Sequence, residues 1–360
     1  MRWPPGTSAR VKRFDTLTFV RPRRDRRSRL YAPPPLQTAG DLVQYAVSCT
    51  RGSATGVASY IGRESPPALD GSRLLHGIAM KQWDTVAIIG VGLIGGSIGL
   101  ALRQRGVAKT VVGIGRRQSS LRVARRAGAV THTTIDLTKG VADAELIIVC
   151  TPVGTIVEHV RQAAQHCTER VLITDAGSTK QAIVAALDSN LPRGCRYLGS
   201  HPLAGNEKTG AANATADLFE GRLAILTPTK NTRAEDFDLL EEFWESLGSV
   251  VIQMTPEEHD RALAVTSHLP HVAAAALAAA VPESLFRLCG SGMLDTTRIA
   301  AGDPEMWRQI LALNRDNVLT ALEQYGAKLS ALHAAIRDGN QDDITRFLTL
   351  AKKNRDALGS

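Results

Sequence analysis

The most informative stretch of the chain is a short apolar run that leads into closely spaced glycines: Val86-Ala87-Ile88-Ile89-Gly90-Val91-Gly92-Leu93-Ile94-Gly95-Gly96-Ser97. The β-branched run predicts a buried strand, and the residues after the glycines predict a helix. In such a strand–turn–helix, Gly90 permits the tight turn, Gly92 lets the backbone approach a pyrophosphate, and Gly95 lets helix and strand pack closely. The helix N-terminus then presents N–H groups and its positive dipole end to the phosphates.

The surroundings of this run favour a nucleotide site over an ordinary glycine-rich turn. From Thr85 onward, short β-branched runs alternate with helix-like stretches, which is typical of a parallel sheet covered by helices. The expected strands are 85–89, 110–114, 146–150 and 171–174, and the expected helices include 94–105 and 119–127. We therefore predict an α/β fold with a Rossmann-type doubly wound sheet. The residues expected at the dinucleotide are Gly90, Gly92, Leu93, Ile94, Gly95, Thr151 and Pro152.

The end of the second expected strand bears on which dinucleotide binds. An NAD site usually has Asp or Glu there, about 20 residues past the glycines, to hold the ribose hydroxyls. This chain instead has Gly115 followed by Arg116 and Arg117. Without the carboxylate a 2′-phosphate is not repelled, and a guanidinium can bind it in bidentate fashion. We expect NADP to be favoured; NAD, dual use, or two merely solvated arginines remain open.

Beyond residue 253 the pattern becomes almost purely helical. Thr255-Pro256-Glu257-Glu258 supplies an N-cap, a proline at the first helical position and a capping-box glutamate, so a long helix should begin here. The most apolar stretch, 262–281, is long enough to span a bilayer but carries His268, Pro270 and His271, and we expect a buried helix and no membrane association. Its alanine-rich part, 273–280, would let another helix approach closely, as in a homodimer.

The chain thus divides into three segments. We expect a basic leader over 1–79, a dinucleotide-binding domain over 80–253 and a helical substrate and dimerisation domain over 254–360. The leader holds 13 basic and 5 acidic residues, whereas the remainder holds 30 of each and gives no reason to expect nucleic acid binding. Eight of the 16 prolines and no apolar periodicity predict disorder in the leader. It could be a transit peptide, an anion-binding tail or a product of start-site choice, and we favour translation from Met80.

The five cysteines are odd in number, scattered and without a CxxC pair, so neither a disulfide framework nor a zinc site is expected. A reducing compartment, the cytoplasm, fits this usage, with organellar targeting by the leader as the alternative. Three histidines, His259, His268 and His271, could ligate a metal by residue type, but we expect no metal.

Four polar segments interrupt apolar surroundings after the first strands. Two of them, 175–180 and 199–207, follow strand-like runs and should lie at the carboxyl ends of strands, where open α/β sheets bind ligands. In the third, His259, Ser267 and His271 are 8 and 4 apart, so on a regular α-helix they share one stripe and could face one cavity. His268 lies off that stripe and reads as a core or surface histidine. The fourth segment, 295–300, precedes Trp307.

These motifs, in this order, resemble those of the prephenate/arogenate dehydrogenase family of tyrosine biosynthesis, from about Thr85 to at least Trp307. The resemblance is carried by the glycine loop, Asp175-Ala176-Gly177-Ser178-Thr179-Lys180, Gly199-Ser200-His201-Pro202-Leu203-Ala204-Gly205-Asn206-Glu207, Ser267-His268-Leu269-Pro270-His271 and Asp295-Thr296-Thr297-Arg298-Ile299-Ala300. It implies that His201 is the catalytic histidine, Ser178 its neighbouring active-site serine and Arg298 the substrate-binding arginine. It also places Glu207, His259, Ser267, His271 and Trp307 in the pocket. Departures are Asn206, where threonine is frequent, and Gly115, where NAD-using members have an acid.

The family reaction, oxidative decarboxylation of prephenate to 4-hydroxyphenylpyruvate or of arogenate to tyrosine, accounts for these residue types. Hydride leaves the carbon that bears the ring hydroxyl, and a neutral imidazole can accept the hydroxyl proton. We expect His201 to accept it, Ser178 to orient the hydroxyl or the imidazole, and the planar donors of Arg298 to bind one substrate carboxylate. His259 or His271 could bind the other carboxylate.

Two other functions fit parts of the sequence. One is a two-domain NADP-dependent dehydrogenase of another small hydroxy or imino acid, and the other is a nucleotide-sensing protein without catalysis. The first class usually relies on a lysine or serine in its helical domain, whereas the best base here, His201, lies near the sheet. Individual residues also have plainly structural interpretations: His201 could cap a turn, Arg298 could pair with Asp295 or Asp303, and Trp307 could belong to the core.

Overall fold

The computed structural model describes residues 81–189, 191–205 and 208–359. The predictions for the leader and for Met80 fall outside these residues. The described chain contains one compact unit that ends at Phe347, and the residues from Leu348 onward, which complete the last helix, belong to a second unit. The fold described below is that of residues 81–347.

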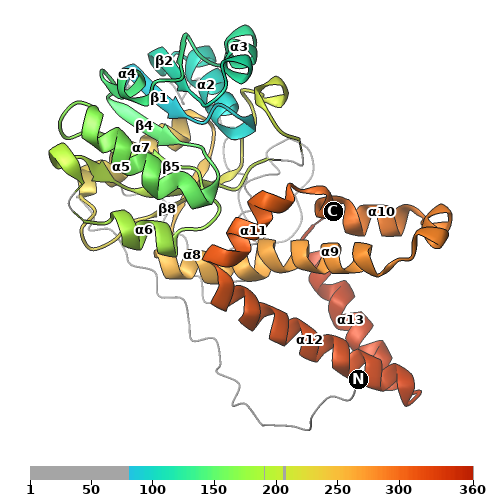
Figure 1. The fold of residues 1–360 in the computed structure, drawn as a ribbon. Coiled ribbons are helices and arrows are strands. Elements are labelled where there is room, and N and C mark those ends of the chain that lie inside the picture. Colours follow the sequence, from blue (N-terminus) through green and yellow to red (C-terminus); the bar gives the residue numbers. More distant parts are fainter. Residues whose placement is uncertain (1–80, 190, 206–207, 360) are drawn as a thin grey trace, which may run out of the picture. The chain divides into compact units, whose positions relative to one another are not determined.

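A six-stranded parallel sheet forms the first part of this unit (Figure 1). Its strands are β1 (Trp83–Ile89), β2 (Ala108–Ile114), β3 (His132–Thr134), β4 (Leu146–Val149), β5 (Leu172–Asp175) and β6 (Arg196–Tyr197). They lie in the order β3-β2-β1-β4-β5-β6, and every neighbouring pair is parallel. The strand order reverses between β1 and β4, where doubly wound sheets bind dinucleotides. The prediction of a Rossmann-type doubly wound sheet is confirmed.

Helices cover both faces of the sheet, so successive residues of β1 are buried on opposite sides. Val86 and Ile88 share a hydrophobic core with α2 (Leu93–Gln104), α3 (Gln118–Arg126) and α7 (Ala234–Ser246). Ala87 and Ile89 share a second core with helices α4 (Leu137–Val141), α5 (Ile156–His166) and α6 (Gln181–Leu187). This two-sided burial explains why β1 reads as a continuous apolar run.

A second, three-stranded sheet corrects one prediction. Its strands are β7 (Gly199–Pro202), β8 (Leu223–Thr227) and β9 (Val250–Gln253), with β7 antiparallel to β8 and β8 parallel to β9. The expectation that His201 follows the end of a strand is therefore wrong, because His201 lies inside β7, opposite Ile225. The chain leaves β6 at Tyr197 and enters β7 two residues later, and all four residues of β7 are buried.

The remaining described chain is helical. It contains α8 (Pro256–Leu263), a π-helical turn η5 (Ala264–His268), α9 (Leu269–Ala280), α10 (Ser291–Thr297), the 3₁₀ turn η7 (Arg298–Ala301), α11 (Pro304–Leu313), α12 (Arg315–Arg337) and α13 (Gln341–Ala357). The predicted helix start is confirmed. The Thr255 hydroxyl accepts a hydrogen bond from the Glu258 N–H at 3.2 Å, and the Glu258 carboxylate accepts one from the Thr255 N–H at 3.0 Å.

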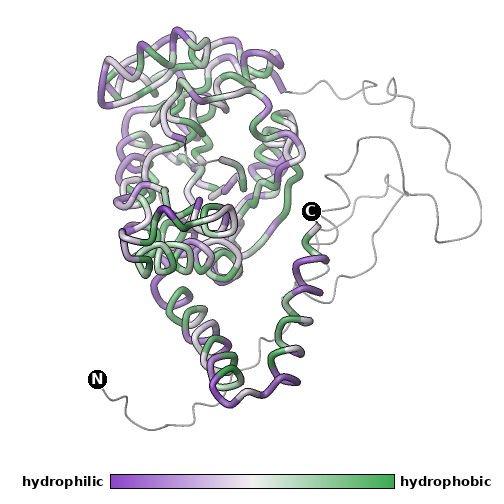
Figure 2. Tube along the Cα trace, turned by 90° about the vertical axis from the view of Figure 1, so that its right-hand side faces the viewer, coloured by the Kyte–Doolittle hydropathy of each residue, from purple (hydrophilic) through white to green (hydrophobic). Residues whose placement is uncertain are grey.

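The expectation that 262–281 is a buried helix is wrong within a single chain. The helical stretch Pro256–Ala280 is long and apolar enough to cross a membrane by length and composition alone, yet only 28% of its most apolar window is buried. Of the 16 large hydrophobic side chains exposed in the described residues, 14 lie beyond residue 264. Figure 2 shows hydrophobic residues along α12 as well as in the sheet. Exposed apolar side chains on helices are typical of an interface between subunits.

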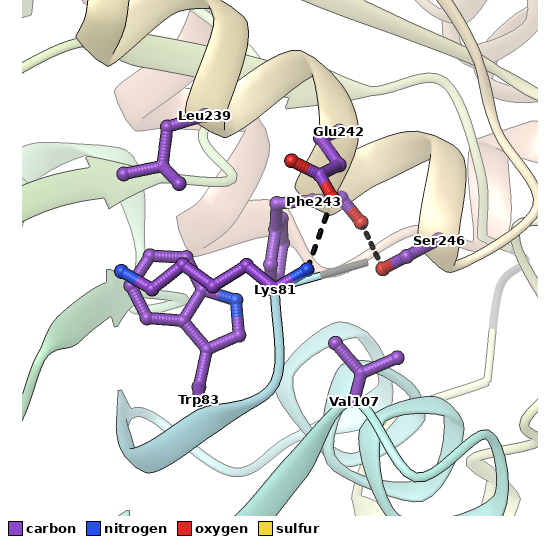
Figure 3. A pocket seen from close by; sticks show the side chains of 7 residues that line it. All are labelled: Lys81, Trp83, Val107, Leu239, Glu242, Phe243 and Ser246. Atoms are coloured by element: carbon purple, nitrogen blue, oxygen red, sulfur yellow. Dashed lines mark hydrogen bonds between the residues drawn. The ribbon is translucent and has the colours of Figure 1, made fainter. Parts of the chain in front are cut away.

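The amino end of β1 is closed by α7. The Lys81 N–H donates a hydrogen bond to the Glu242 carboxylate at 3.0 Å, and the Lys81 ammonium lies 3.7 Å from the centre of the Trp83 ring. The small pocket between these residues, shown in Figure 3, has a volume of about 10 Å³. That volume accommodates about one water molecule, so this end of the strand has no room for a cofactor.

Candidate active site

The glycine loop lies at the carboxyl end of β1, where the strand order reverses. Gly90 has φ +95°, and a Cβ there would lie 2.7 Å from the Cys150 carbonyl oxygen. A Cβ on Gly95 would collide with the carbonyl oxygen of Gly90, so this glycine keeps α2 close to the loop. A Cβ on Gly92 would meet no atom within 4 Å. Gly92 is therefore the glycine that borders open space, where a pyrophosphate could approach.

The N-terminus of α2 is suited to an anion. Gly92 is its N-cap residue, no side chain caps it, and its first turn, which includes Leu93 and Ile94, contains no acidic residue. Thr151, which follows β4 together with Pro152, borders the loop, because a Cβ on Gly90 would lie 3.0 Å from the Thr151 methyl group. Backbone N–H groups and a positive dipole end without a competing carboxylate fit the phosphates of a dinucleotide.

The carboxyl end of β2 presents two exposed arginines. Arg116 and Arg117 follow β2 directly, and Arg117 is the N-cap residue of α3. The preceding residue, Gly115, packs against α3, since a Cβ there would lie 3.1 Å from Leu121 Cδ2. Any side chain at position 115 would therefore require Leu121 to shift by a few tenths of an ångström.

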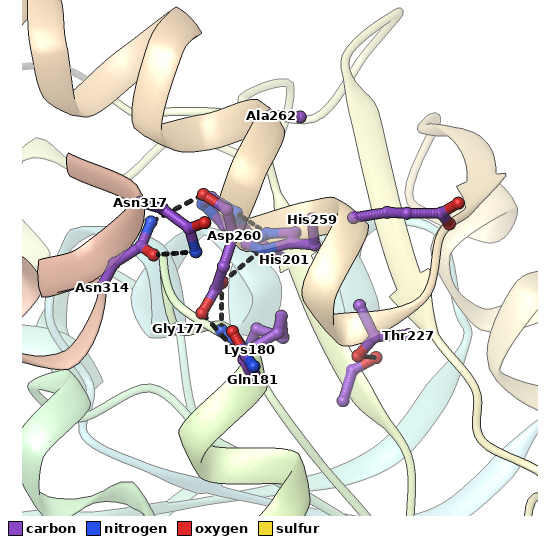
Figure 4. A network of polar contacts seen from close by, with 12 residues as sticks. Gly177, Lys180, Gln181, His201, Thr227, His259, Asp260, Ala262, Asn314 and Asn317 are labelled. Carbon is purple, nitrogen blue, oxygen red and sulfur yellow. Dashed lines mark hydrogen bonds and ion pairs between the residues drawn. The ribbon is translucent and has the colours of Figure 1, made fainter. Parts of the chain in front are cut away.

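Two histidines from distant parts of the sequence meet in the centre of the site (Figure 4). His201 Nδ1 lies 2.8 Å from His259 Nε2, and His259 Nδ1 lies 2.8 Å from Asp260 Oδ1. The exposed fraction is 8% for His201 and 0% for His259. Burial holds the pKa of His201 well below its usual range, and the nearby His259, Lys180 and His268 lower it further. The His201 imidazole is thus neutral at pH 7 and able to accept a proton.

The pKa of His259 is lowered as well. Burial lowers the pKa of His259, the hydrogen bond to Asp260 opposes this, and the nearby Lys180 ammonium lowers it further. A neutral imidazole has one ring nitrogen that donates and one that accepts.

Ser178 lies in a rigid loop after β5, as predicted for residues 175–180. Asp175, the last residue of β5, forms an ion pair with Lys180, and both side chains are fully buried. The Asp175 carboxylate also accepts hydrogen bonds from the Gly177 N–H at 2.8 Å and from the Tyr197 hydroxyl at 2.6 Å. Ser178 is half-buried between these anchored residues.

The π-helical turn changes the spacing of the histidines on the helical side. His259 and His271 are buried and Ser267 is half-buried, but His268, which α-helical spacing places off their stripe, is buried as well. A π turn inserts one extra residue into the α-helical register, so the spacings of 8 and 4 no longer describe one straight face. His268 Nδ1 lies 3.1 Å from Asn314 Nδ2.

His271 and Trp307 form a flat aromatic pair. Their rings are stacked, with centroids 3.5 Å apart and an angle of 8° between the planes. His268 meets the same Trp307 ring edge-on at 6.1 Å. The structure thus brings Trp307 of α11 together with His271 of α9 and His268 of η5.

The remaining predicted residues are placed less completely. Arg298 begins η7, a turn that packs against α9, and its side chain is exposed. Glu207 falls outside the described residues, as does Asn206.

Sequence analysis missed the polar residues that organise this site. Asp260 accepts hydrogen bonds from the backbone N–H groups of Lys180 at 2.7 Å and of Gln181 at 3.0 Å. Asn314 donates a hydrogen bond to the Asp260 carbonyl oxygen at 2.7 Å. The only local signal was a carboxylate directly after His259, and its contacts with residues about 80 positions away leave no trace in the pattern.

A doubly wound sheet with a glycine loop at its switch point, followed by a helical region, defines a dinucleotide-binding protein. Comparisons identify its family. The chain matches the model of the prephenate dehydrogenase nucleotide-binding domain over residues 98–253 and that of the prephenate dehydrogenase dimerization domain over residues 255–350. The protein belongs to the prephenate dehydrogenase family, as the sequence motifs predicted.

Relatives and solved structures agree with this assignment. The chain is 34% identical over 282 residues to prephenate dehydrogenase of Bacillus subtilis, covering 76% of each chain. It is 32% identical over 286 residues to cyclohexadienyl dehydrogenase of Zymomonas mobilis, covering 78% of this chain and 97% of the relative. Prephenate dehydrogenase from Aquifex aeolicus, solved with hydroxyphenyl propionate and NAD+, has a TM-score of 0.71 and 33% identity, over 76% of this chain and 97% of that one. Synechocystis arogenate dehydrogenase has a TM-score of 0.63 and 29% identity, over 76% and 99%.

Proposed function

We propose that this protein is an NAD(P)-dependent dehydrogenase that oxidatively decarboxylates prephenate, arogenate or both, forming 4-hydroxyphenylpyruvate or tyrosine. The observation that carries the proposal is the buried His201, hydrogen-bonded to His259, in a chain of this family. Relatives named for prephenate, for arogenate and for cyclohexadienyl substrates all resemble the chain, so the proposal includes both substrates.

Each catalytic residue has one task in this reaction. Hydride leaves the ring carbon that bears the hydroxyl, and the bound nicotinamide supplies the acceptor for it. His201 takes the hydroxyl proton, which is worth about 10² to 10⁴-fold in rate for a well-placed general base. Ser178, held by the anchored loop after β5, orients the hydroxyl or the imidazole. Loss of the ring carboxylate as CO₂ leaves an aromatic ring and makes the reaction effectively irreversible.

Substrate binding falls to the helical side. Arg298 offers a planar donor fork for one carboxylate, and its exposed side chain leaves it accessible to a charged ligand. The stacked His271 and Trp307 rings form a flat wall suited to a six-membered ring. The further pocket residues of this proposal are Glu207 and Ser267. His259 belongs to the same site but is fully buried and hydrogen-bonded through both ring nitrogens, so it lies behind His201 and is not the ligand of a substrate carboxylate.

The cofactor proposal is NADP in preference to NAD. It is supported by the two exposed arginines after β2 and by Gly115 at the position where an NAD site usually has an acid. The phosphates would lie against Gly90, Gly92, Leu93, Ile94 and Gly95, with Thr151 and Pro152 bordering the site.

A homodimer through the helical region is supported by the dimerization-domain match and by the exposed apolar side chains beyond residue 264. We propose a domain boundary between residues 253 and 254, and a cytoplasmic location.

The decisive experiment measures the appearance of reduced cofactor at 340 nm with purified protein. Prephenate and arogenate are each supplied with NAD and with NADP. Turnover with at least one of the four combinations is expected, and no turnover with any of them would refute the proposed function.

A further inference from the structure

Asp260 is the end of a chain of hydrogen bonds that leads to the proposed base. Its Oδ1 lies 2.8 Å from His259 Nδ1, and His259 Nε2 lies 2.8 Å from His201 Nδ1. All three side chains are buried, with exposed fractions of 0% for both His259 and Asp260 and 8% for His201. Figure 4 shows them side by side.

The partners of Asp260 determine the direction of the first hydrogen bond. Both carboxylate oxygens accept from backbone N–H groups, Oδ1 from Lys180 and Oδ2 from Gln181. A carboxylate that accepts on both oxygens has no proton to donate to a neighbouring ring. His259 Nδ1 therefore carries a hydrogen and donates it to Asp260.

The second hydrogen bond follows from the first. A neutral imidazole with its hydrogen on Nδ1 can only accept at Nε2. His259 Nε2 faces His201 Nδ1, so His201 must carry its own hydrogen on Nδ1. The one ring nitrogen of His201 that retains a lone pair is then Nε2.

We propose that Asp260 and His259 are positioning residues that hold His201 in the tautomer with its hydrogen on Nδ1, so that Nε2 is the atom that accepts the substrate proton. This inference rests on the proposed function for the identity of the proton donor.

The chain also stabilises the charge that proton transfer creates. The substrate O–H bond breaks and an N–H bond forms at His201 Nε2, while the oxygen electron pair becomes the second C–O bond as hydride leaves the carbon. His201 becomes an imidazolium in a site where burial and Lys180 disfavour positive charge. The Asp260 carboxylate, two hydrogen bonds away, is the nearest compensating charge along this chain.

The same hydrogen bonds connect the proton acceptor to the packing of α8 against α6. Asp260 belongs to α8, yet its carboxylate binds the backbone at the start of α6, directly after the loop that contains Ser178. Asn314 holds the Asp260 carbonyl oxygen from the other side at 2.7 Å. The position of α8 thus influences the orientation of both Ser178 and His201 through Asp260.

The first test reads the tautomer directly in the intact protein. Long-range ¹H–¹⁵N NMR spectra of protein labelled with ¹⁵N-histidine distinguish a hydrogen on Nδ1 from one on Nε2, and the His201→Asn variant assigns the signal. We expect His201 to carry its hydrogen on Nδ1 at pH 7.5. A hydrogen on Nε2 would overturn the proposal, and this readout does not depend on turnover.

The second test removes the charge with Asp260→Asn. The amide cannot replace a carboxylate that accepts on both oxygens, so we expect the preferred tautomer of His201 to be lost and kcat to fall by about 10² to 10⁴-fold. The KM values for substrate and cofactor should change less than about threefold, because Asp260 is fully buried and its carboxylate is occupied by His259 and two backbone N–H groups. An Asp260→Asn variant whose kcat stays within threefold of the parent would contradict the inference.

A matched control separates positioning from stability. Thr255→Ala removes the cap of the same helix, α8, without touching the hydrogen-bonded chain. It should lower the Tm measurably and leave kcat and the His201 tautomer unchanged. A kcat loss in Thr255→Ala as large as that in Asp260→Asn would assign both effects to helix stability. Failure of the proposed function would appear differently, as absent turnover in the parent protein.

Discussion

The glycine loop and the imidazole chain (His201, His259 and Asp260) are the two proposed functional centres of this protein, yet they are built in opposite ways. The glycine loop is one continuous segment after β1, and the groups it offers are backbone N–H groups. The imidazole chain is assembled from β7 and α8, and the groups it offers are side chains.

This difference has consequences for how each centre fails. The conformation of the glycine loop requires residues without a side chain, because a Cβ at Gly90 or Gly95 would collide with neighbouring backbone. In the imidazole chain each hydrogen bond sets the direction of the next one, so the loss of one partner changes the protonation of the neighbouring ring. Substitutions in the loop should therefore affect cofactor binding, and substitutions in the chain should affect the rate of the chemical step.

The largest effect is expected from His201→Asn. Removal of the proposed proton acceptor should lower kcat by about 10² to 10⁴-fold, since an asparagine side chain cannot take up the proton and His259 is fully buried behind this position. Cofactor affinity, measured by fluorescence titration, should remain within twofold because the glycine loop is untouched. Normal turnover in His201→Asn would show that the imidazole chain is structural and would remove the contrast between the two centres.

The next prediction concerns how the free energy of unfolding changes at acidic pH because of the buried His268. Burial lowers the pKa of His268 from 6.5 to about 4. A folded-state pKa below the unfolded one means that stability is full above pH 6.5 and is lost as the pH falls towards 4. The loss should be about 3 kcal/mol for this residue, measured by urea unfolding at pH 7.5, 6 and 4.5.

His268→Gln supplies the control for this pH dependence. The amide does not titrate, so the variant should lose clearly less stability between pH 7.5 and 4.5 than the parent. His201 and His259 shift in the same direction and should leave a residual dependence. Equal pH dependence in both proteins would exclude His268 as a contributor.

A pair of alanine substitutions tests the glycine loop. A Cβ on Gly92 meets no atom, so Gly92→Ala should fold with an unchanged Tm but bind cofactor at least tenfold more weakly, because the methyl group lies where the pyrophosphate approaches. Gly95→Ala should instead lower the Tm, since its Cβ collides with the Gly90 carbonyl oxygen. Equal effects of the two substitutions on Tm would contradict the assigned roles.

The smallest effect is expected at the second strand. Arg116→Ala together with Arg117→Ala should lower kcat/KM for NADP by about tenfold or more, because the loss of one charge-assisted hydrogen bond costs about 1.5 to 3 kcal/mol. The value for NAD should stay within twofold. An equal loss with both cofactors, or a tenfold preference of the parent protein for NAD, would refute the proposed phosphate contact.

The predictions from sequence succeeded where the signal was local. The strand, the glycines and the helix of the loop follow one another between Trp83 and Gln104, and the capping box lies within four residues, so periodicity and spacing were sufficient. They failed where a short irregularity intervened. A single residue, Leu198, separates β6 from β7 and leads His201 into a second sheet, and the π turn moved His268 onto the buried side of its helix.

The amino-acid sequence by itself determined the doubly wound sheet, the glycine loop and the family, because each depends on residues close together in the chain. The tertiary structure alone decided that His259 bridges His201 and Asp260, and that Asp260 joins α8 to α6. A hydrogen bond between side chains 58 positions apart requires both backbones to be placed to within a fraction of an ångström. Spacing along a chain does not encode that placement; the packing of helix against sheet does.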